Sequence, residues 1–272
     1  MRSRLIRYTI NDLLEVRDVF SKYGIVFWLD HGTLLGAIRD RRLIPWDTDV
    51  DLGMFEAEKR KLSRAINELR KKGFYVFYDN IIDRLIVMRF GLRINISFYK
   101  WIAKGRYVYE RAWTTRSYII IAGLDSIRRL MLIPQRAYLD YRLRLELLHH
   151  WSFLYRPFRL ILVIPFKIRV AISSIMKFFI KLLAEILVKL IGGKSVAFVV
   201  PSHHFKELDT IEFYGANFYV PSDTEKYLER HYGKEWRVPK REWCWFKDDN
   251  SLRTIYEGKT IVRGNKVLTN ST

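Results

Sequence analysis

The chain has 272 residues, of which 49% are hydrophobic and 15% aromatic, with 14 glycines and 7 prolines. This composition excludes a disordered, collagen-like or low-complexity chain, and the length is enough for either one large domain or a domain with an appendage. A single cysteine excludes an intramolecular disulfide and a four-cysteine zinc site. The 48 Lys and Arg residues exceed the 29 Asp and Glu residues, so the net charge of +19 predicts a negative partner such as phosphate, nucleic acid or an anionic membrane face.

The sequence contains no segment typical of secretion or of membrane spanning. The N-terminus carries early positive charge but no apolar run of signal-peptide length. Near the middle of the chain, the longest charge-free apolar stretches are Leu160–Phe166 and Val170–Met176, far short of the roughly 20 residues that span a bilayer. We therefore expect a cytoplasmic location without a signal peptide or spanning helix.

The first part of the chain alternates helical and strand patterns. Apolar residues at helical spacing predict a first helix, a β-branched and aromatic run predicts a buried strand, and alternating Asp and apolar residues predict another strand. In chain order the predictions are a helix over 10–23, a strand over 25–29, a turn and helix over 30–39, a strand over 47–55, a helix over 56–72, and strands over 74–78, 85–90 and 92–99.

The pattern then changes twice, which predicts three parts: residues 1–133, a helical basic insertion over 134–193, and a compact part over 194–272 that begins with a strand. In the insertion, one helix face carries the charged residues and a wide apolar surface covers the rest. This helix has two possible roles. Either it lies in the plane of an anionic membrane, as a peripheral contact on the inner membrane face, or it packs against the helical residues that precede it. The charged residues of that face are Lys177, Lys181, Glu185 and Lys189.

The residues with the clearest chemistry are closely spaced acids. If Asp49–Leu52 is a strand, Asp49 and Asp51 project from one face about 6–7 Å apart. Two unpaired carboxylates repel each other, and Mg²⁺ or Mn²⁺, which prefer oxygen ligands, would relieve that repulsion. The upstream Gly32 and Thr33 stand where a strand gives way to a helix, and the free backbone N–H groups there suit a phosphate. This combination predicts an active site rather than a solvated strand edge.

These residues resemble the LicD and fukutin-related family, in which Gly-Thr-Leu-Leu-Gly precedes Ile-Pro-Trp-Asp-x-Asp-x-Asp. Here the two motifs are residues 32–36 and 44–51, and a second similar block with Val-Pro, Tyr-Leu and Tyr-Gly covers 211–239. The resemblance implies an α+β fold with a polymerase-β-like nucleotidyltransferase core and a mixed sheet. It also implies transfer of a phospho-substituent, such as phosphocholine or a polyol phosphate, from a CDP-linked donor to a sugar of a glycan or glycolipid.

Carried over by position, the resemblance makes Asp49 and Asp51 the metal ligands and places Gly32 and Thr33 against the donor phosphate. Asp47 would extend the acidic set. By their charge, two arginines between the motifs are either diphosphate contacts or solvent-facing basic residues: Arg39 and Arg42. We infer no protein partner.

Two positions depart from the family pattern. Thr48 replaces a second adjacent Asp, and strand alternation points it away from the two metal ligands. Asn95 stands where a third acid is usual; its amide could ligate a metal but could not act as a general base. Either Asn95 is a weaker ligand and another acid, such as Asp83, is the base, or catalysis is attenuated.

Two other functions fit the same residues. The acids would equally serve a nucleotidyltransferase acting on RNA or on a small hydroxyl compound, with the excess charge marking an RNA track. Alternatively, Asn95 would mark a catalytically silent protein that sits on membranes and binds glycans.

Overall fold

The computed structural model describes residues 2–79, 83–102, 105, 107–112, 164–190, 195–256, 260–263 and 266–269. The chain divides into two compact units, Met1–Trp113 with Ser195–Thr272, and Thr114–Lys194. The borders predicted at 133/134 and 193/194 lie outside the described residues.

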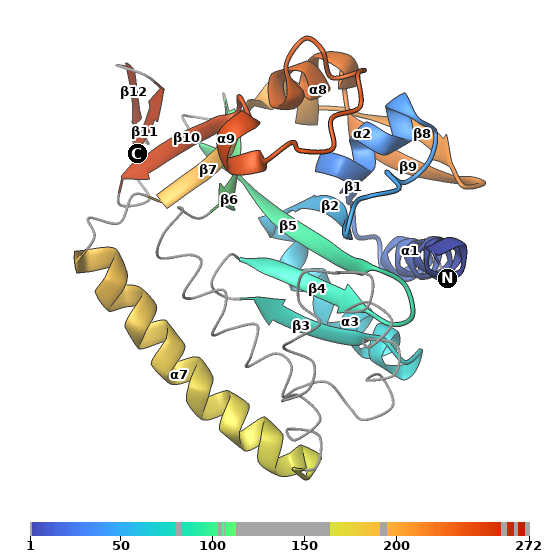
Figure 1. The fold of residues 1–272 in the computed structure, drawn as a ribbon, viewed down its shortest axis with the longest axis vertical. Coiled ribbons are helices and arrows are strands. Elements are labelled where there is room, and N and C mark those ends of the chain that lie inside the picture. Colours follow the sequence, from blue (N-terminus) through green and yellow to red (C-terminus); the bar gives the residue numbers. More distant parts are fainter. Residues whose placement is uncertain are drawn as a thin grey trace. The chain divides into compact units, whose positions relative to one another are not determined.

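The larger unit is organised around one mixed β-sheet, whose strands follow one another in Figure 1 from β12 at one end to β8 at the other. The order is β12-β11-β10-β7-β6-β5-β2-β1-β9-β8, with the β3–β4 hairpin attached through β4 to β5. The strands are β1 (Trp28–Leu29), β2 (Asp49–Phe55), β3 (Tyr75–Asp79), β4 (Arg84–Met88), β5 (Arg93–Ile102), β6 (Tyr107–Ala112), β7 (Ser195–Pro201), β8 (Leu208–Phe213), β9 (Ala216–Pro221), β10 (Leu252–Tyr256), β11 (Thr260–Arg263) and β12 (Lys266–Thr269).

Among the strands that the structure describes, two pairs are parallel, β2 with β5 and β1 with β9, and the other pairs are antiparallel. The long strand β5 is central. Its first half pairs with β4 and its second half with β6, while β2 runs along its other edge. The mixed sheet with its helices confirms the predicted α+β class; the polymerase-β-like core stays a prediction.

Helices complete the larger unit and bury apolar faces in one core. In the first helix Leu13, Val16 and Phe20 are fully buried, and their spacing of three and four residues places them on one face. They belong to the same core as Trp28 and Leu29 of β1. The helices of this unit are α1 (Arg2–Lys22), α2 (His31–Arg39), the 3₁₀ helix η1 (Glu56–Lys61), α3 (Leu62–Lys71), the 3₁₀ helix η3 (Ser202–Phe205), α8 (Thr224–Tyr232) and α9 (Trp245–Asp248).

Some predicted elements differ in extent. The predicted strand over 25–29 shortens to Trp28–Leu29, because only these residues have ladder partners in β2 and β9. The predicted helix over 56–72 begins as a 3₁₀ helix before it becomes α3. Gly73, with φ of 87°, then follows as a left-handed residue that ends the helix.

In the smaller unit, the described part of the predicted helical insertion is α7 (Phe166–Leu190). Within the described residues, no helix has both the length and the apolar character needed to cross a membrane. The side chains of the four charged residues predicted to share one face of this helix lie outside the described part of the structure.

Candidate active site

Strands β2 and β5 bring the predicted acids together. Their parallel register sets Asp49 opposite Arg93 and Asp51 opposite Asn95. Alternate residues of a strand share a face, and accordingly the Asn95 amide Nδ2 donates to Asp49 Oδ2 at 2.8 Å and to Asp51 Oδ1 at 3.1 Å. Asp47 lies two residues before β2. We call Asp47, Asp49 and Asp51 the acid cluster.

Asp47 lies against the first turn of α2. A Cβ added at Gly32 would collide with Oδ2 of Asp47. The other oxygen, Oδ1, accepts a hydrogen bond from the backbone N–H of Thr48 at 2.8 Å. Gly32 therefore allows a carboxylate to touch the start of the helix, a reason for glycine that the sequence did not reveal.

The acid cluster carries unbalanced negative charge. Burial, followed by the charges of Asp49 and Asp51, raises the pKa of Asp47 to about 8. Burial and the charge of Asp49 raise the pKa of Asp51 to about 6. Burial opposes the ionised form of Asp49 as well, but Arg93 and Asn95 together hold its pKa below the ordinary value. Asp47 and Asp51 are therefore harder to ionise than an ordinary aspartate, and a cation bound nearby would favour their ionised forms.

Two arginines supply part of the missing positive charge, and sequence analysis missed both. Arg93 Nη2 donates to Asp49 Oδ2 at 2.6 Å. Arg84 Nη2 donates to Glu110 Oε1 at 2.7 Å; burial disfavours its charged form, but Glu110 and Asp51 raise its pKa. Arg93 was detectable, because it precedes Asn95 by two residues in a predicted strand and so shares its face.

Thr33 connects the first turn of α2 to strand β2. Its side chain is buried, with 2% of the residue exposed, and its Oγ1 accepts the backbone N–H of Asp51 at 2.8 Å. The hydroxyl thus positions β2 against α2. The predicted contacts of Gly32 and Thr33 with a donor phosphate stay predictions, now resting on their backbone N–H groups in the first turn of α2.

The other predicted residues lie elsewhere. Arg39 is the last residue of α2 and makes a two-point contact with Asp40, at 3.0 and 2.7 Å. Arg42 is exposed in the following loop. Asp83, the alternative base, contacts Lys59 and also Tyr78 and Lys100. The contacts described for these three residues do not join them to the acid cluster.

A second set of polar groups lies beside the acid cluster and was not predicted. Asp30 accepts hydrogen bonds from Tyr99 and Tyr227, each at 2.7 Å. His31 Nε2 lies 2.6 Å from Glu110 Oε2. Burial opposes the charge on His31, but the charges of Asp30 and Glu110 raise its pKa to about 10. We call these five residues the buried network.

The acid cluster fits the divalent cation that the sequence predicts. Asp49 and Asp51 offer carboxylate oxygens, which Mg²⁺ and Mn²⁺ prefer. Among the described residues, Oδ1 of Asn95 is buried without a hydrogen-bond partner. Rotating this amide by half a turn would direct that oxygen toward the two carboxylates as a third ligand.

Comparisons with known proteins agree with this site. Residues 24–117 match the family described as LicD/FKTN/FKRP, nucleotidyltransferase domain. The human ribitol 5-phosphate transferase FKRP is 51% identical over 64 residues, which cover 22% of this chain and 13% of that protein. The human ribitol-5-phosphate transferase FKTN is 42% identical over 50 residues, covering 18% of this chain and 11% of that protein.

A protein of Rickettsia prowazekii (strain Madrid E), described as uncharacterised, is 31% identical over 65 residues, covering 24% of each chain. The chain thus spans about a quarter or less of the length of these curated relatives. A solution structure of the antibiotic-resistance factor ANT(2'')-Ia aligns with 64% of this chain and 98% of its own, at 12% identity and a TM-score of 0.31. A TM-score this low does not define the fold.

The matched segment contains the acid cluster, Gly32 and Asn95, so the family match and the geometry concern the same residues. The resemblance seen in the sequence is confirmed for residues 24–117, which match the model of the LicD/fukutin-related family.

Proposed function

We propose that this protein is a metal-dependent transferase. It moves a phospho-substituent, of the polyol phosphate or phosphocholine type, from a CDP-linked donor to a sugar hydroxyl of a glycan or glycolipid. The observation that carries the proposal is the grouping of three carboxylates, of which Asp47 lies against the first turn of α2, inside the segment that matches the LicD family. The names of FKRP and FKTN as ribitol-phosphate transferases support the class of reaction.

The residues of the site have separate roles in this proposal. The backbone N–H groups of Gly32 and Thr33 bind the donor diphosphate at the positive end of α2. Asp49 and Asp51, with Asn95, hold Mg²⁺ or Mn²⁺, which when bound supplies positive charge to the phosphoryl oxygens. Arg93 keeps the Asp49 carboxylate ionised, because its guanidinium lies 2.6 Å away.

The transfer itself is an in-line displacement. The acceptor hydroxyl oxygen bonds to the β-phosphorus that carries the substituent, the bond from that phosphorus to the CMP oxygen breaks, and CMP leaves. The Asp47 carboxyl releases its own proton to solvent when positive charge reaches its neighbours, and the carboxylate then takes the hydroxyl proton. We assign it this role because Asp49 and Asp51 already accept hydrogen bonds from Arg93 and Asn95 and are the residues that would hold the cation.

The decisive experiment follows the products. Purified protein with Mg²⁺ is incubated with CDP-linked donors, CTP or UTP, and extracted surface glycans, and the products are identified by mass spectrometry. We expect CMP from a CDP-linked donor, and loss of this product in Asp49→Asn. The matched control Asp18→Asn, at a residue whose side chain is 65% exposed on α1, should retain it. Release of pyrophosphate with nucleotide addition would instead establish the nucleotidyltransferase alternative, and CDP binding without turnover the silent alternative.

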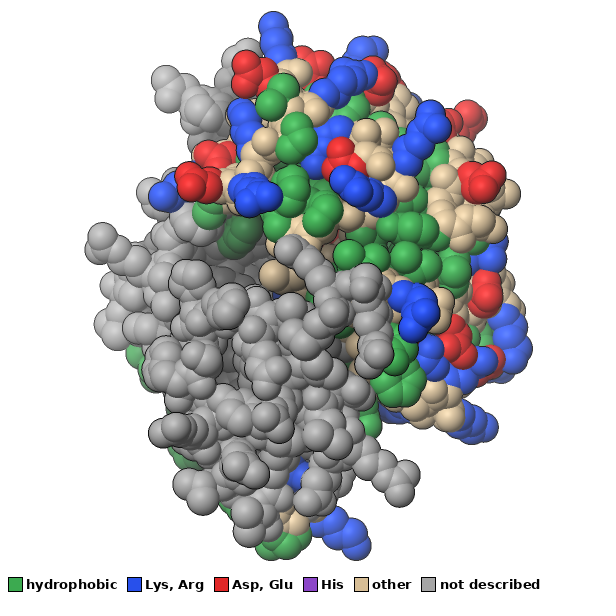
Figure 2. Space-filling model, turned by 45° about the vertical axis from the view of Figure 1, so that its right-hand side comes forward, with side chains coloured by type: hydrophobic (Ala, Val, Ile, Leu, Met, Phe, Trp, Pro, Cys, Tyr) green, Lys and Arg blue, Asp and Glu red, His purple; other side chains and the backbone are tan. Residues whose placement is uncertain are grey.

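The distribution of surface charge bears on the RNA alternative. Among the described residues on the face shown in Figure 2, Lys and Arg side chains are interspersed with Asp and Glu and form no continuous strip. An RNA track uses a row of basic groups along the phosphate backbone. This face therefore favours a small donor over a long RNA.

We also propose that α7 lies in the plane of an anionic membrane surface. Five large apolar residues of α7 recur at spacings of seven, four, three and four, which places them on one helix face, and a sixth adjoins them. All six are exposed: Ile168, Ile175, Phe178, Phe179, Leu182 and Ile186. The helix sequence also carries an excess of basic residues, which anionic lipid attracts.

Sedimentation with phosphatidylglycerol vesicles tests the membrane proposal. The double substitution Phe178→Ser and Phe179→Ser should remove most of the bound fraction, because it removes two exposed aromatic rings of the helix. Val238→Ser, at an apolar residue that is 57% exposed in the larger unit, is the matched control and should bind as the unsubstituted protein does. Equal binding by all three proteins would favour the alternative in which this helix packs against protein.

A further inference from the structure

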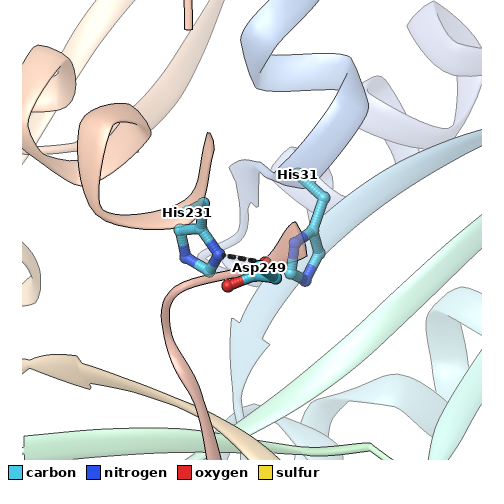
Figure 3. Close-up of side chains that lie close together, drawn as sticks. All are labelled: His31, His231 and Asp249. Atoms are coloured by element: carbon cyan, nitrogen blue, oxygen red, sulfur yellow. Dashed lines mark hydrogen bonds and ion pairs between the residues drawn. The ribbon is translucent and has the colours of Figure 1, made fainter. Parts of the chain in front are cut away.

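We propose that His31, His231 and Asp249 form a second metal site, which takes Zn²⁺ and is distinct from the acid cluster. Figure 3 shows the three side chains close together, with His231 and His31 on either side of Asp249. One ligand atom from each residue lies within 4.8 Å of the other two. Such a separation is within reach of one cation after small adjustments, because zinc bonds to nitrogen and oxygen are about 2.0–2.2 Å long.

The three residues come from distant parts of the chain. His31 begins α2, His231 lies in the last turn of α8, and Asp249 follows α9. The side chains of His231 and Asp249 are fully buried and that of His31 is 13% exposed. A buried group of two imidazoles and one carboxylate, assembled from three segments, has the composition of a zinc site with three protein ligands and an open fourth position.

Other residues already orient Asp249 and His31. Asp249 Oδ1 accepts hydrogen bonds from the Ser251 backbone N–H at 2.7 Å and from its hydroxyl at 2.6 Å, and Oδ2 faces His231 Nδ1 at 2.8 Å. His31 Nε2 is held by Glu110 at 2.6 Å, which leaves Nδ1 for a metal. Metal-binding histidines characteristically have their second nitrogen fixed by a carboxylate in this way.

The neighbouring carboxylates are poorer candidates, although Asp30, His31 and Glu110 are also close together. Both oxygens of Asp30 accept hydrogen bonds from buried tyrosines, and Glu110 is paired with Arg84 as well as with His31. His231, by contrast, retains a buried Nε2 without a partner among the described residues. Its hydrogen bond to Asp249 therefore satisfies only part of the ring.

The donor types separate this site chemically from the acid cluster. Imidazole nitrogen suits Zn²⁺, whereas Mg²⁺ selects oxygen ligands. On binding, Zn²⁺ takes the place of the proton between His231 Nδ1 and Asp249 Oδ2 and of the proton on His31 Nδ1, and both protons go to solvent. The bound ion would fasten α8 and the loop after α9 to the start of α2, next to Gly32.

Equilibrium binding tests the proposal. Protein stripped with a chelator is titrated with Zn²⁺ against a chromophoric chelator in excess Mg²⁺, and we expect one Zn²⁺ per chain. His231→Gln and Asp249→Asn should each weaken binding by at least tenfold. His203→Gln, at an exposed histidine, and Asp223→Asn, at an exposed aspartate, are matched controls and should bind as the unsubstituted protein does.

A measurement on the unsubstituted protein covers the case in which a variant fails to fold. X-ray absorption at the zinc edge should show two imidazole ligands together with oxygen ligands. An absence of binding, a first shell made only of oxygen, or zinc binding that is lost in Asp49→Asn but retained in His231→Gln would overturn the proposal. Because zinc is measured directly, the result is independent of whether the protein releases CMP.

Discussion

The acid cluster and the buried network contain similar side chains, yet their charges are balanced differently. In the buried network, Asp30 receives hydrogen bonds from two buried tyrosines, and Glu110 contacts His31 and Arg84, which are partly buried. In the acid cluster, the carboxylates of Asp47 and Asp51 lie beside another carboxylate, and their pKa values rise. A balanced carboxylate holds elements together, whereas an unbalanced one provides a place for a cation. Substitutions in the acid cluster should therefore mainly lower the rate of the reaction, whereas substitutions in the buried network should mainly lower the free energy of unfolding.

The largest effect is expected for Asp51→Asn, which removes a cation ligand and one of the repelling charges. We expect kcat for CMP release to fall by about 10³-fold or more. The melting temperature should stay equal or rise, because the repulsion with Asp49 is relieved. Steady-state kinetics and circular dichroism check both parts. A rate within tenfold of the unsubstituted protein would contradict the role given to Asp51.

The buried network should respond in the opposite way. Asp30→Ala leaves the hydroxyls of Tyr99 and Tyr227 without their acceptor and removes the N-cap of α2. We expect the free energy of unfolding to fall by about 3 kcal/mol, measured by urea denaturation. Asp18→Ala, at an exposed position, should change it by less than about 0.5 kcal/mol. If the two variants were equally stable, the network would not be what holds these elements together.

Gly32→Ala tests the contact between the two regions. The added Cβ would collide with Asp47 Oδ2 and push that carboxylate away from α2. We expect a loss of stability of about 1–2 kcal/mol and a fall in kcat of roughly 10–100-fold. In Gly32→Ala combined with Asp47→Ala, the stability loss should shrink because the collision is gone. Additive losses in this double-mutant cycle would show that the two residues do not meet.

The smallest effect concerns the pH dependence of stability. The pKa of Asp47 is about 8 in the folded protein against 3.8 as its ordinary value, so the folded state binds a proton more tightly than the unfolded state between these pH values. Stability should therefore fall as pH rises through this window.

Asp47→Asn removes that dependence. In the presence of a chelator, the stability of the variant relative to the unsubstituted protein should increase between pH 5 and pH 8. At pH 8 its free energy of unfolding should be higher by on the order of 1–2 kcal/mol. Thermal unfolding at several pH values measures the gain, and added Mg²⁺ should reduce it at pH 8. Parallel pH curves for the two proteins would mean that Asp47 ionises normally.

Local patterns were sufficient to predict which face of the sheet carries Asp49, Asp51 and Asn95. The alternation in 47–55 and in 92–99 was enough to place Asp49, Asp51 and Asn95 on strands, because a period of two fixes the face of each side chain. Residues that act across strands were harder to find. Arg93 became a partner of Asp49 only through the parallel register of β2 and β5, which the sequence alone did not determine.

Charge alone did not decide between the alternatives for the two predicted arginines. Arg39 and Arg42 were predicted from their charge as either diphosphate contacts or solvent-facing residues; Arg39 is paired with its neighbour Asp40, Arg42 is exposed, and a diphosphate contact stays a prediction. Glu110 and Tyr227 are separated widely from His31 and Asp30 in sequence and meet them only in the folded chain. These contacts depend on the order of the strands in the sheet. The alternation of residues along each strand does not reveal that order.

The pairing of β6 with β7 has a consequence for how the chain is built. Ala112 at the end of β6 stands opposite Val196 near the start of β7, so the chain leaves the larger unit and re-enters it at one point of the sheet. Closing two adjacent antiparallel strands requires only a tight turn, and the entropic penalty of a longer connection rises slowly with length. We therefore expect that a short Asn-Gly turn can replace the residues between β6 and β7 without loss of the acid cluster. Any affinity for lipid should be lost from the shortened chain, because α7 is among the residues removed.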